Sequence, residues 1–169
     1  MTDVIDDVAG IAEGSRLFEL RRQKPDLVRY SEGSHAVLLA PAEPGGLSLA
    51  ERAAVALRMA VLHQADRLAT HYRTRLHAVG GAALAAVAEQ GPDAPALDPA
   101  PSARVAAILR HAARLMAHPE SATPAHLEAL LAVGLAPRDI VTLSQLIAFV
   151  SYQVRVLAGL RALAEEARP

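Results

Sequence analysis

The stretch that decides the fold is residues 46–81, GLSLAERAAVALRMAVLHQADRLATHYRTRLHAVGG. Ser48 is followed three residues later by Glu51, which is the spacing of a capping box at the start of a helix. Apolar residues then recur at spacings of three and four, as on the buried face of a helix, and these are Val55, Met59 and Leu62. The pair Gly80–Gly81 favours a left-handed helix end. The sequence therefore predicts helix from residue 50 to residue 77.

The polar segment at residues 63–66, HQAD, interrupts this pattern. Two arrangements are consistent with it, namely one continuous helix or two helices in sequence. In a continuous helix, steps of seven residues return to the same face, and these positions are Glu51, Arg58, Ala65 and Tyr72. Only that arrangement gives the helix a continuous polar face.

The same kinds of helix start and stop signals occur on both sides of residues 46–81. Serine or threonine caps, prolines in first turns and closing glycines divide the rest of the chain into helices. The predicted helices cover residues 15–22, 25–39, 82–89, 102–117, 123–134 and 137–165. Residues 41–46 and the proline-rich segment 91–101 interrupt them as loops.

The composition agrees with an all-α fold. Alanine and leucine, which favour helices, dominate the chain, while aromatic residues make up only 3% of it. A chain of 169 residues that is 52% hydrophobic predicts one folded domain rather than a disordered segment. We divide that domain into an N-terminal helical arm (1–44), a core motif (45–90), a loop (91–101) and closing helices (102–169).

Several classes of function are excluded or disfavoured. The chain has no cysteine, so thiol and disulfide chemistry are excluded. The formal net charge of −1 offers no basic field for nucleic acid. An acidic N-terminus and the lack of an unbroken apolar run of about 20 residues predict a cytoplasmic protein without a membrane span. No histidines are spaced three or four apart and no phosphate loop is present, so we expect neither a metal nor a cofactor.

Polar residues on the two longest predicted helices are the candidates for a site. Beside Glu51, Arg58 and Tyr72, one face of the last helix groups Gln145, Tyr152 and Arg155. Two such faces opposed would form a pocket inside an apolar bundle. Each residue also has a structural alternative: helix capping for the glutamate, ion pairs for the arginines, and buried, hydrogen-bonded hydroxyls for the tyrosines.

Two parts of the chain look familiar: residues 47–52, 56–60 and 71–72 form one motif, and residues 134–140 and 149–156 form another. The first resembles the core motif of the carboxymuconolactone decarboxylase and AhpD-like superfamily, and the second resembles the closing helix of that superfamily. Residues 3–41 also look like the N-terminal stretch of a small subfamily of such proteins. The resemblance implies an AhpD-like bundle of about six helices plus N-terminal helices, assembled as a homo-oligomer, either a trimer or a hexamer.

The chain departs from the redox branch of this superfamily. In that branch a Cys-x-x-Cys pair reduces peroxides, while a histidine four residues later and an upstream glutamate relay protons. The ungapped match places Ala65 and Leu68 at the two cysteine positions and Tyr72 at the histidine position. His71 lies one residue earlier, and Glu51 is the candidate for the upstream acid. Dithiol peroxidase activity is excluded because no sulfur nucleophile is present.

Three hypotheses for the function follow. The resemblance to the decarboxylase branch implies acid–base chemistry on a small organic acid or lactone. Its catalytic residues would be His71, Tyr72 and Glu51, and its substrate-binding residues Arg58, His63, Gln145, Tyr152 and Arg155. The second hypothesis is a non-catalytic oligomeric or small-ligand-binding module. The third is a partner subunit of a cysteine-bearing AhpD-like paralogue.

Overall fold

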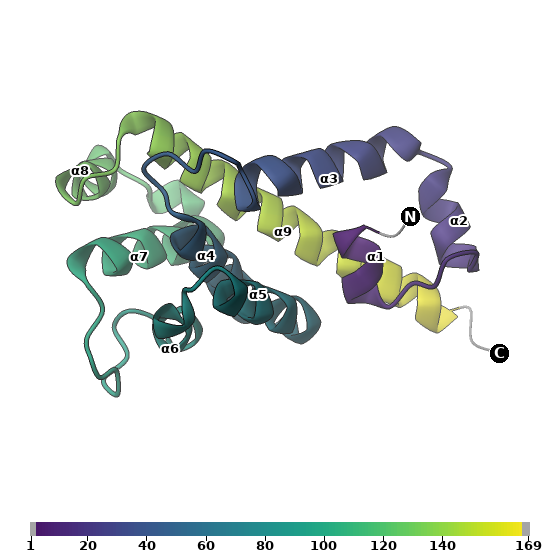
Figure 1. Cartoon of the computed structure of the whole chain (residues 1–169), viewed down its shortest axis with the longest axis horizontal. Coiled ribbons are helices and arrows are strands. Elements are labelled where there is room, and N and C mark those ends of the chain that lie inside the picture. The colour runs from purple at the N-terminus through teal and green to yellow at the C-terminus, as the bar shows by residue number, and fades with distance from the viewer. Residues whose placement is uncertain (1–2, 167–169) are drawn as a thin grey trace.

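The computed structural model describes residues 3–166, and within that range the chain forms nine α-helices, two short 3₁₀ helices and no strand (Figure 1). This confirms the predicted all-α fold. The α-helices are α1 (Val4–Ala9), α2 (Arg16–Arg22), α3 (Pro25–Leu39), α4 (Leu49–Leu62), α5 (Asp66–Ala78), α6 (Ala85–Gln90), α7 (Ala103–Ala117), α8 (Pro124–Ala132) and α9 (Pro137–Glu166). The 3₁₀ helices are Ala82–Leu84 and Pro119–Ser121.

The central stretch is two helices rather than one. The helix α4 begins with the predicted capping box between Ser48 and Glu51 and ends at Leu62. Gln64 then adopts a left-handed backbone conformation with φ of 55°, and α5 starts at Asp66. Gly81, after α5, comes back against Ala50 at the start of α4, so the two helices form a hairpin. The continuous polar face with steps of seven residues therefore does not exist.

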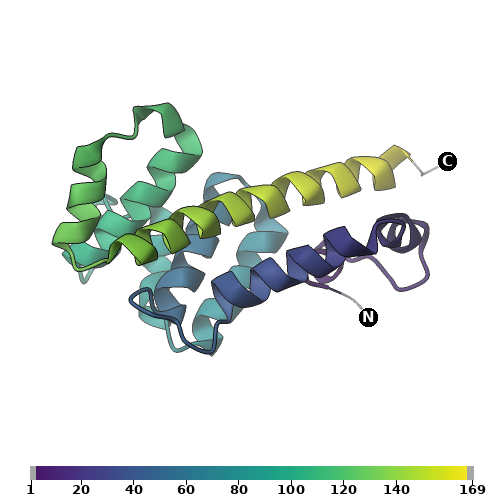
Figure 2. The same cartoon turned by 90° about the horizontal axis from the view of Figure 1, so that it is seen from above.

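The main core lies around α4, which is enclosed by α5, α6, α7 and α9. Small side chains on α4 let the neighbouring helices approach closely, and those buried to 1% exposure or less include Ala53, Ala54, Ala56 and Ala60. The helix α9 runs along the molecule and also contacts α1, α3 and α8 (Figures 1 and 2). Among the described helices, only α9 is long and apolar enough to cross a membrane, a test that the core helix of a soluble protein also passes.

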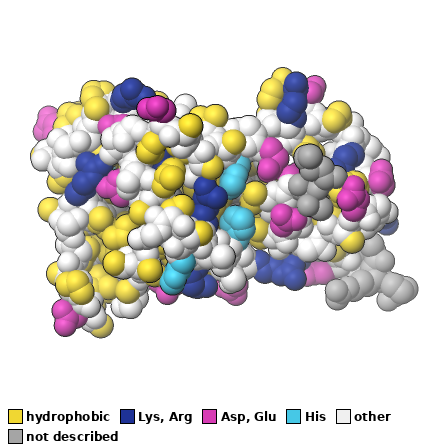
Figure 3. Space-filling model, in the orientation of Figure 1, with side chains coloured by type: hydrophobic (Ala, Val, Ile, Leu, Met, Phe, Trp, Pro, Cys, Tyr) yellow, Lys and Arg dark blue, Asp and Glu magenta, His cyan; other side chains and the backbone are white. Residues whose placement is uncertain are grey.

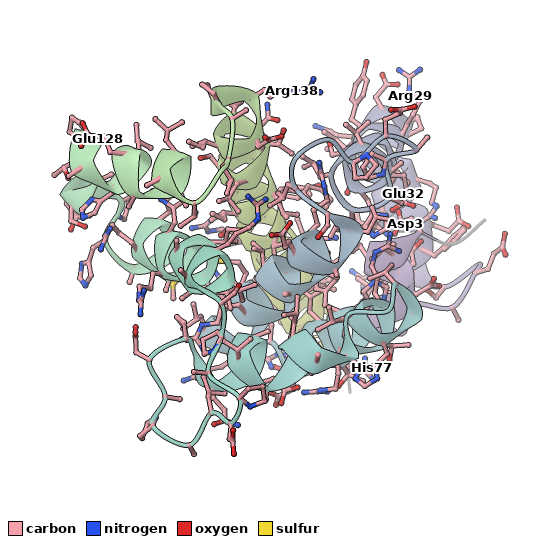
Figure 4. All side chains as sticks on the ribbon, turned by 60° about the vertical axis from the view of Figure 1, so that its left-hand side comes forward. Asp3, Arg29, Glu32, His77, Glu128 and Arg138 are labelled. Carbon is pink, nitrogen blue, oxygen red and sulfur yellow. The ribbon has the colours of Figure 1, made fainter. Side chains whose placement is uncertain are left out.

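The N-terminal arm contains one helix that the sequence analysis missed. The side chain of Asp3 caps α1 by accepting a hydrogen bond from the backbone of Asp6 at 2.8 Å. Asp3 also pairs with Arg21 of α2 at 2.8 Å, and the backbone N–H of Val4 donates to Glu32 of α3 at 3.2 Å. Figure 4 shows the labelled side chains of Asp3 and Glu32 on the same side of the molecule. The helix α1 thus depends on tertiary contacts that a six-residue pattern does not reveal.

A second, small apolar cluster joins the arm to the end of α9. It consists of Ile5, Ile11, Phe18 and Leu160. Its members come from α1, the following loop, α2 and α9, so burying them fixes the arm against the last helix.

The starts of α4 and α9 are tied together by one carboxylate. The buried side chain of Asp139 accepts hydrogen bonds from the backbone of Gly46 at 3.1 Å and of Ala136 at 3.0 Å. The second bond caps α9. A side chain at position 46 would collide with the Asp139 carboxylate, so this close approach requires glycine.

Candidate functional site

Glu51 belongs to a network at the start of α4. Its carboxylate accepts from the backbone of Ser48 at 2.8 Å and pairs with Arg104 of α7 at 2.6 Å. Burial raises the pKa of Glu51, but the hydrogen bonds from Arg104 and Ser48 outweigh this and leave the pKa below its usual value. Within residues 3–166 its partners are therefore structural, and it does not meet His71 or Tyr72 as the candidate relay acid would.

Arg58 lies apart from both Glu51 and Tyr72, beside the end of α6. Its Nη1 donates to the carbonyl of Glu89 at 3.0 Å, and its guanidinium fills the space beside Gly91, whose φ is 95°. Burial lowers the pKa of Arg58. The structure thus gives Arg58 an anchoring contact with the end of α6 in place of the predicted position next to Tyr72.

Tyr72 is fully buried in the core. Its hydroxyl donates a hydrogen bond to the side-chain oxygen of Gln153 on α9, a partner that the sequence analysis did not identify. Burial raises the pKa of Tyr72 well above its ordinary value, more than the bond to Gln153 lowers it. The hydroxyl therefore stays protonated at neutral pH and fixes the position of α5 on α9.

His71 lies next to Tyr72 and belongs to a group of two imidazole rings and one guanidinium. We call this group, His35, His71 and Arg75, the histidine cluster. The rings of His35 and His71 are 6.4 Å apart, and the ring of Phe149 lies 6.5 Å from that of His35. Burial, and then the charge of Arg75, lower the pKa of both histidines, that of His35 to about 4. His35 and Arg75 were missed because only the tertiary fold brings α3 to α5.

A cavity of about 570 Å³, the turn cavity, lies between the α4–α5 turn, the N-terminal arm and the C-terminal half of α9. Its apolar lining includes Val8, Ile11, Leu17, Leu68, Val154 and Leu157. His63 also lines it, and its Nε2 lies 3.4 Å from the hydroxyl of Ser151. Ala65 and Leu68, which the sequence analysis aligned with the two cysteine positions of the redox branch, both line this cavity. A second hollow of about 660 Å³ adjoins it along α1 and α2.

The predicted polar face of α9 points away from the turn cavity. Gln145, Tyr152 and Arg155 are all exposed and none lines the cavity, whose α9 wall instead carries Val154 and Ala158. The ring of Tyr152 stacks on Phe149 at 6.1 Å. Of the predicted binding residues, His63 is thus the one that reaches the turn cavity. Within residues 3–166, no group of three or more histidine, aspartate or glutamate side chains is arranged to hold a metal.

Comparisons with known proteins establish the fold. No family model and no curated protein matches the sequence. The structure is similar to the crystal structure of an alkylhydroperoxidase AhpD core, an uncharacterized peroxidase-related protein from Ralstonia eutropha JMP134, with a TM-score of 0.70. The two sequences are 20% identical, and the match covers 92% of this chain and 78% of the other. The chain therefore has the all-helical AhpD-like fold, in a sequence without cysteine.

Proposed function

We propose that this protein is a non-redox AhpD-fold protein that binds a small organic molecule, an organic acid or a lactone, in the turn cavity. The observation that carries the proposal is the cavity itself. A volume of about 570 Å³ with mostly apolar walls and a few polar groups is typical of small-molecule sites. The apolar walls would contact the body of the ligand, and the polar groups would orient it.

Polar and charged groups line the turn cavity from two helices and the turn between α4 and α5: His63 in the turn, Asp66 and Arg67 on α5, and Arg161 and Glu165 on α9. His63 offers ring nitrogens, and the pKa of this histidine is lowered by burial and by the charge of Arg155, which favours the neutral ring at pH 7. Arg67 also lines the cavity, and its Nη1 donates to the backbone carbonyl of Ala9 at 2.9 Å. Arg161 pairs with Glu165 at 3.7 Å, so Arg67 and the neutral imidazole of His63 are the groups we propose to meet a single carboxylate or a lactone carbonyl of the ligand.

The cavity lining also defines the chemistry that this site lacks. Ala65 and Leu68 present aliphatic side chains at the positions where the redox branch of the superfamily has its thiols. Aliphatic groups cannot exchange electrons or attack a peroxide, so the cavity is suited to binding rather than dithiol reduction.

A substitution at the rim tests the proposal without disturbing the core. Ala158 is exposed but lines the turn cavity, so Ala158→Phe should fill it and weaken ligand binding at least ten-fold. Ala148→Phe, also at an exposed alanine of α9 but outside the cavity, is the matched control. Ligand-observed NMR with a set of small carboxylic acids and lactones measures the binding. Equal affinity for both variants, or no bound compound in the set, would refute the proposal.

Acid–base catalysis at His71 is the second candidate function, and one observation favours it. The Nε2 atom of His71 is buried and has no hydrogen-bond partner among the described residues, and the lowered pKa of His71 leaves it neutral and able to accept a proton. A His71→Ala protein that keeps its helical circular dichroism should lose turnover of any lactone that the native protein converts. Unchanged kinetics would remove His71 from the mechanism.

A further inference from the structure

We propose that the histidine cluster, His35, His71 and Arg75, binds the carboxylate of a small aromatic monoanion at a site separate from the turn cavity. Three nitrogen atoms carry the proposal: Nε2 of His35, Nε2 of His71 and Nε of Arg75. All three are buried, and none has a hydrogen-bond partner among residues 3–166. Buried polar groups are generally paired, so three unpaired nitrogens in one cluster indicate a place for an external acceptor.

The backbone places the three side chains together. His71 and Arg75 are one turn apart on α5 and so share a face. Nη2 of Arg75 donates to the carbonyl of Leu39 at 2.7 Å, one turn after His35 on α3. This bond holds the guanidinium beside both rings while leaving its Nε free to donate.

The charge of the cluster selects a monoanion. Arg75 forms no ion pair with a carboxylate in the described part of the chain, so its positive charge is not neutralised locally. Both histidines are neutral at pH 7, and each neutral ring can donate one N–H. The charge of Asp7 raises the pKa of His71, but less than burial and the charge of Arg75 lower it. One positive charge with neutral donors matches a carboxylate better than a dianionic phosphate.

The surroundings select the rest of the ligand. Phe149 lies 6.5 Å from the His35 ring, and Tyr72 meets His71 edge-on at 5.1 Å. Tyr72 and Phe149 are buried behind the histidines, so the partly exposed rings of His35 and His71 are the ones that a flat aromatic group beside the carboxylate would contact. Both histidines and Arg75 are only partly buried, and Figure 3 shows histidine side chains at the surface beside a lysine or arginine near the middle of one face. The three nitrogen atoms themselves are covered, so a ligand reaches them only when these partly exposed side chains move apart.

This inference does not depend on the turn cavity, which contains none of the three residues. Acid–base catalysis at His71 would require the substrate to bind at the histidine cluster. Binding of a carboxylate at the histidine cluster does not require any catalysis. Binding without turnover would thus support the inference and count against catalysis.

The test uses the full chain, labelled with ¹⁵N-histidine, and benzoate as the probe. Benzoate should bind saturably and shift the side-chain resonances of His35 and His71. Arg75→Gln and His35→Ala should each weaken binding at least ten-fold. Arg73→Gln is the matched control, because Arg73 is on the same helix but pairs with Glu89 at 2.5 Å, and its affinity should be unchanged. Two substitutions on different helices keep the test informative if one variant does not fold.

Three results would overturn the proposal. The first is benzoate binding that survives both substitutions. The second is a benzoate-induced resonance shift that is confined to His63, which would place the ligand in the turn cavity. In that case Ala158→Phe should abolish the benzoate binding. The third is tighter binding of inorganic phosphate than of benzoate, which would refute the carboxylate class. Benzoate binding that is unchanged in Ala158→Phe separates this site from the one proposed for the function.

Discussion

At the scale of single residues, three histidines with buried, unpaired ring nitrogens are the most distinctive feature of the described chain. His35 and His71 each have an unpaired Nε2, and His111, which is only 4% exposed, has no partner for either ring nitrogen within the described chain. Burial lowers the pKa of all three. The folded protein therefore keeps these rings neutral at pH values where the same rings in the unfolded chain are charged.

This difference predicts a pH-dependent stability. The pKa of His35 falls from 6.5 to about 4 on folding, so between these values the unfolded chain binds a proton that the folded chain does not. The free energy of unfolding should therefore have its full value above about pH 6.5, and it should decrease as the pH drops from there toward 4. Because asparagine does not titrate, we expect the His35→Asn protein to lose about 1 kcal/mol less stability than the native protein over this pH range. This value is smaller than the full pKa shift would give, because solvent screens a half-buried group.

Urea unfolding at pH 7 and pH 5 measures the effect. His118→Asn is the control, because the side chain of His118 is 73% exposed. A native protein and a His35→Asn protein that lose the same stability between the two pH values would contradict the prediction.

At the scale of elements, local signals fixed most helix boundaries. Proline in the first turn and serine or threonine caps correctly predicted the starts of α3, α7, α8 and α9. Two features were beyond local signals. The six residues of α1 are too few for a periodic pattern, and the break after α4 is made by Gln64, a residue type with no preference for left-handed backbone.

The candidate site was predictable only in its residue types. The sequence analysis selected His63, His71 and Tyr72, but the contacts of a side chain depend on residues far away along the chain. Tyr72 bonds to a residue 81 positions later, and Glu51 to one 53 positions later. Only the polar face of Glu51, Arg58 and Tyr72 depended on one continuous helix, which was one of the two predicted arrangements, and the break at Gln64 separates these residues.

At the scale of the whole molecule, the outer surface predicts self-association. Leu27, Tyr30 and Val37 lie along one face of α3 and are 59%, 62% and 68% exposed. The helix α3 contacts α9 near the C-terminal end of α3 and diverges from it toward its N-terminus (Figure 1). The helix α9 carries two further exposed apolar side chains, Val141 and Tyr152. An exposed apolar surface on two neighbouring helices is typical of an interface.

We therefore propose a homo-oligomer, a trimer or a hexamer, that uses the outer face of α3. Native mass spectrometry should find one discrete oligomer, and the double substitution Tyr30→Asp with Val37→Asp should convert it to a folded monomer. Leu131→Asp, at a 45% exposed leucine on α8, is the control and should leave the oligomer intact. A native protein that is monomeric alone and assembles only with a cysteine-bearing AhpD-like paralogue would favour the partner-subunit hypothesis instead.

The carboxylate of Asp139 also makes the residue tolerated at position 46 depend on the residue at position 139. A side chain at position 46 would displace this carboxylate and remove the cap of α9, whereas a smaller residue at position 139 would make room for it. Substitutions at these positions, 93 residues apart, should therefore be tolerated together more readily than the change at position 46 alone. Related sequences should show this as covariation, with glycine at position 46 wherever aspartate caps the last helix.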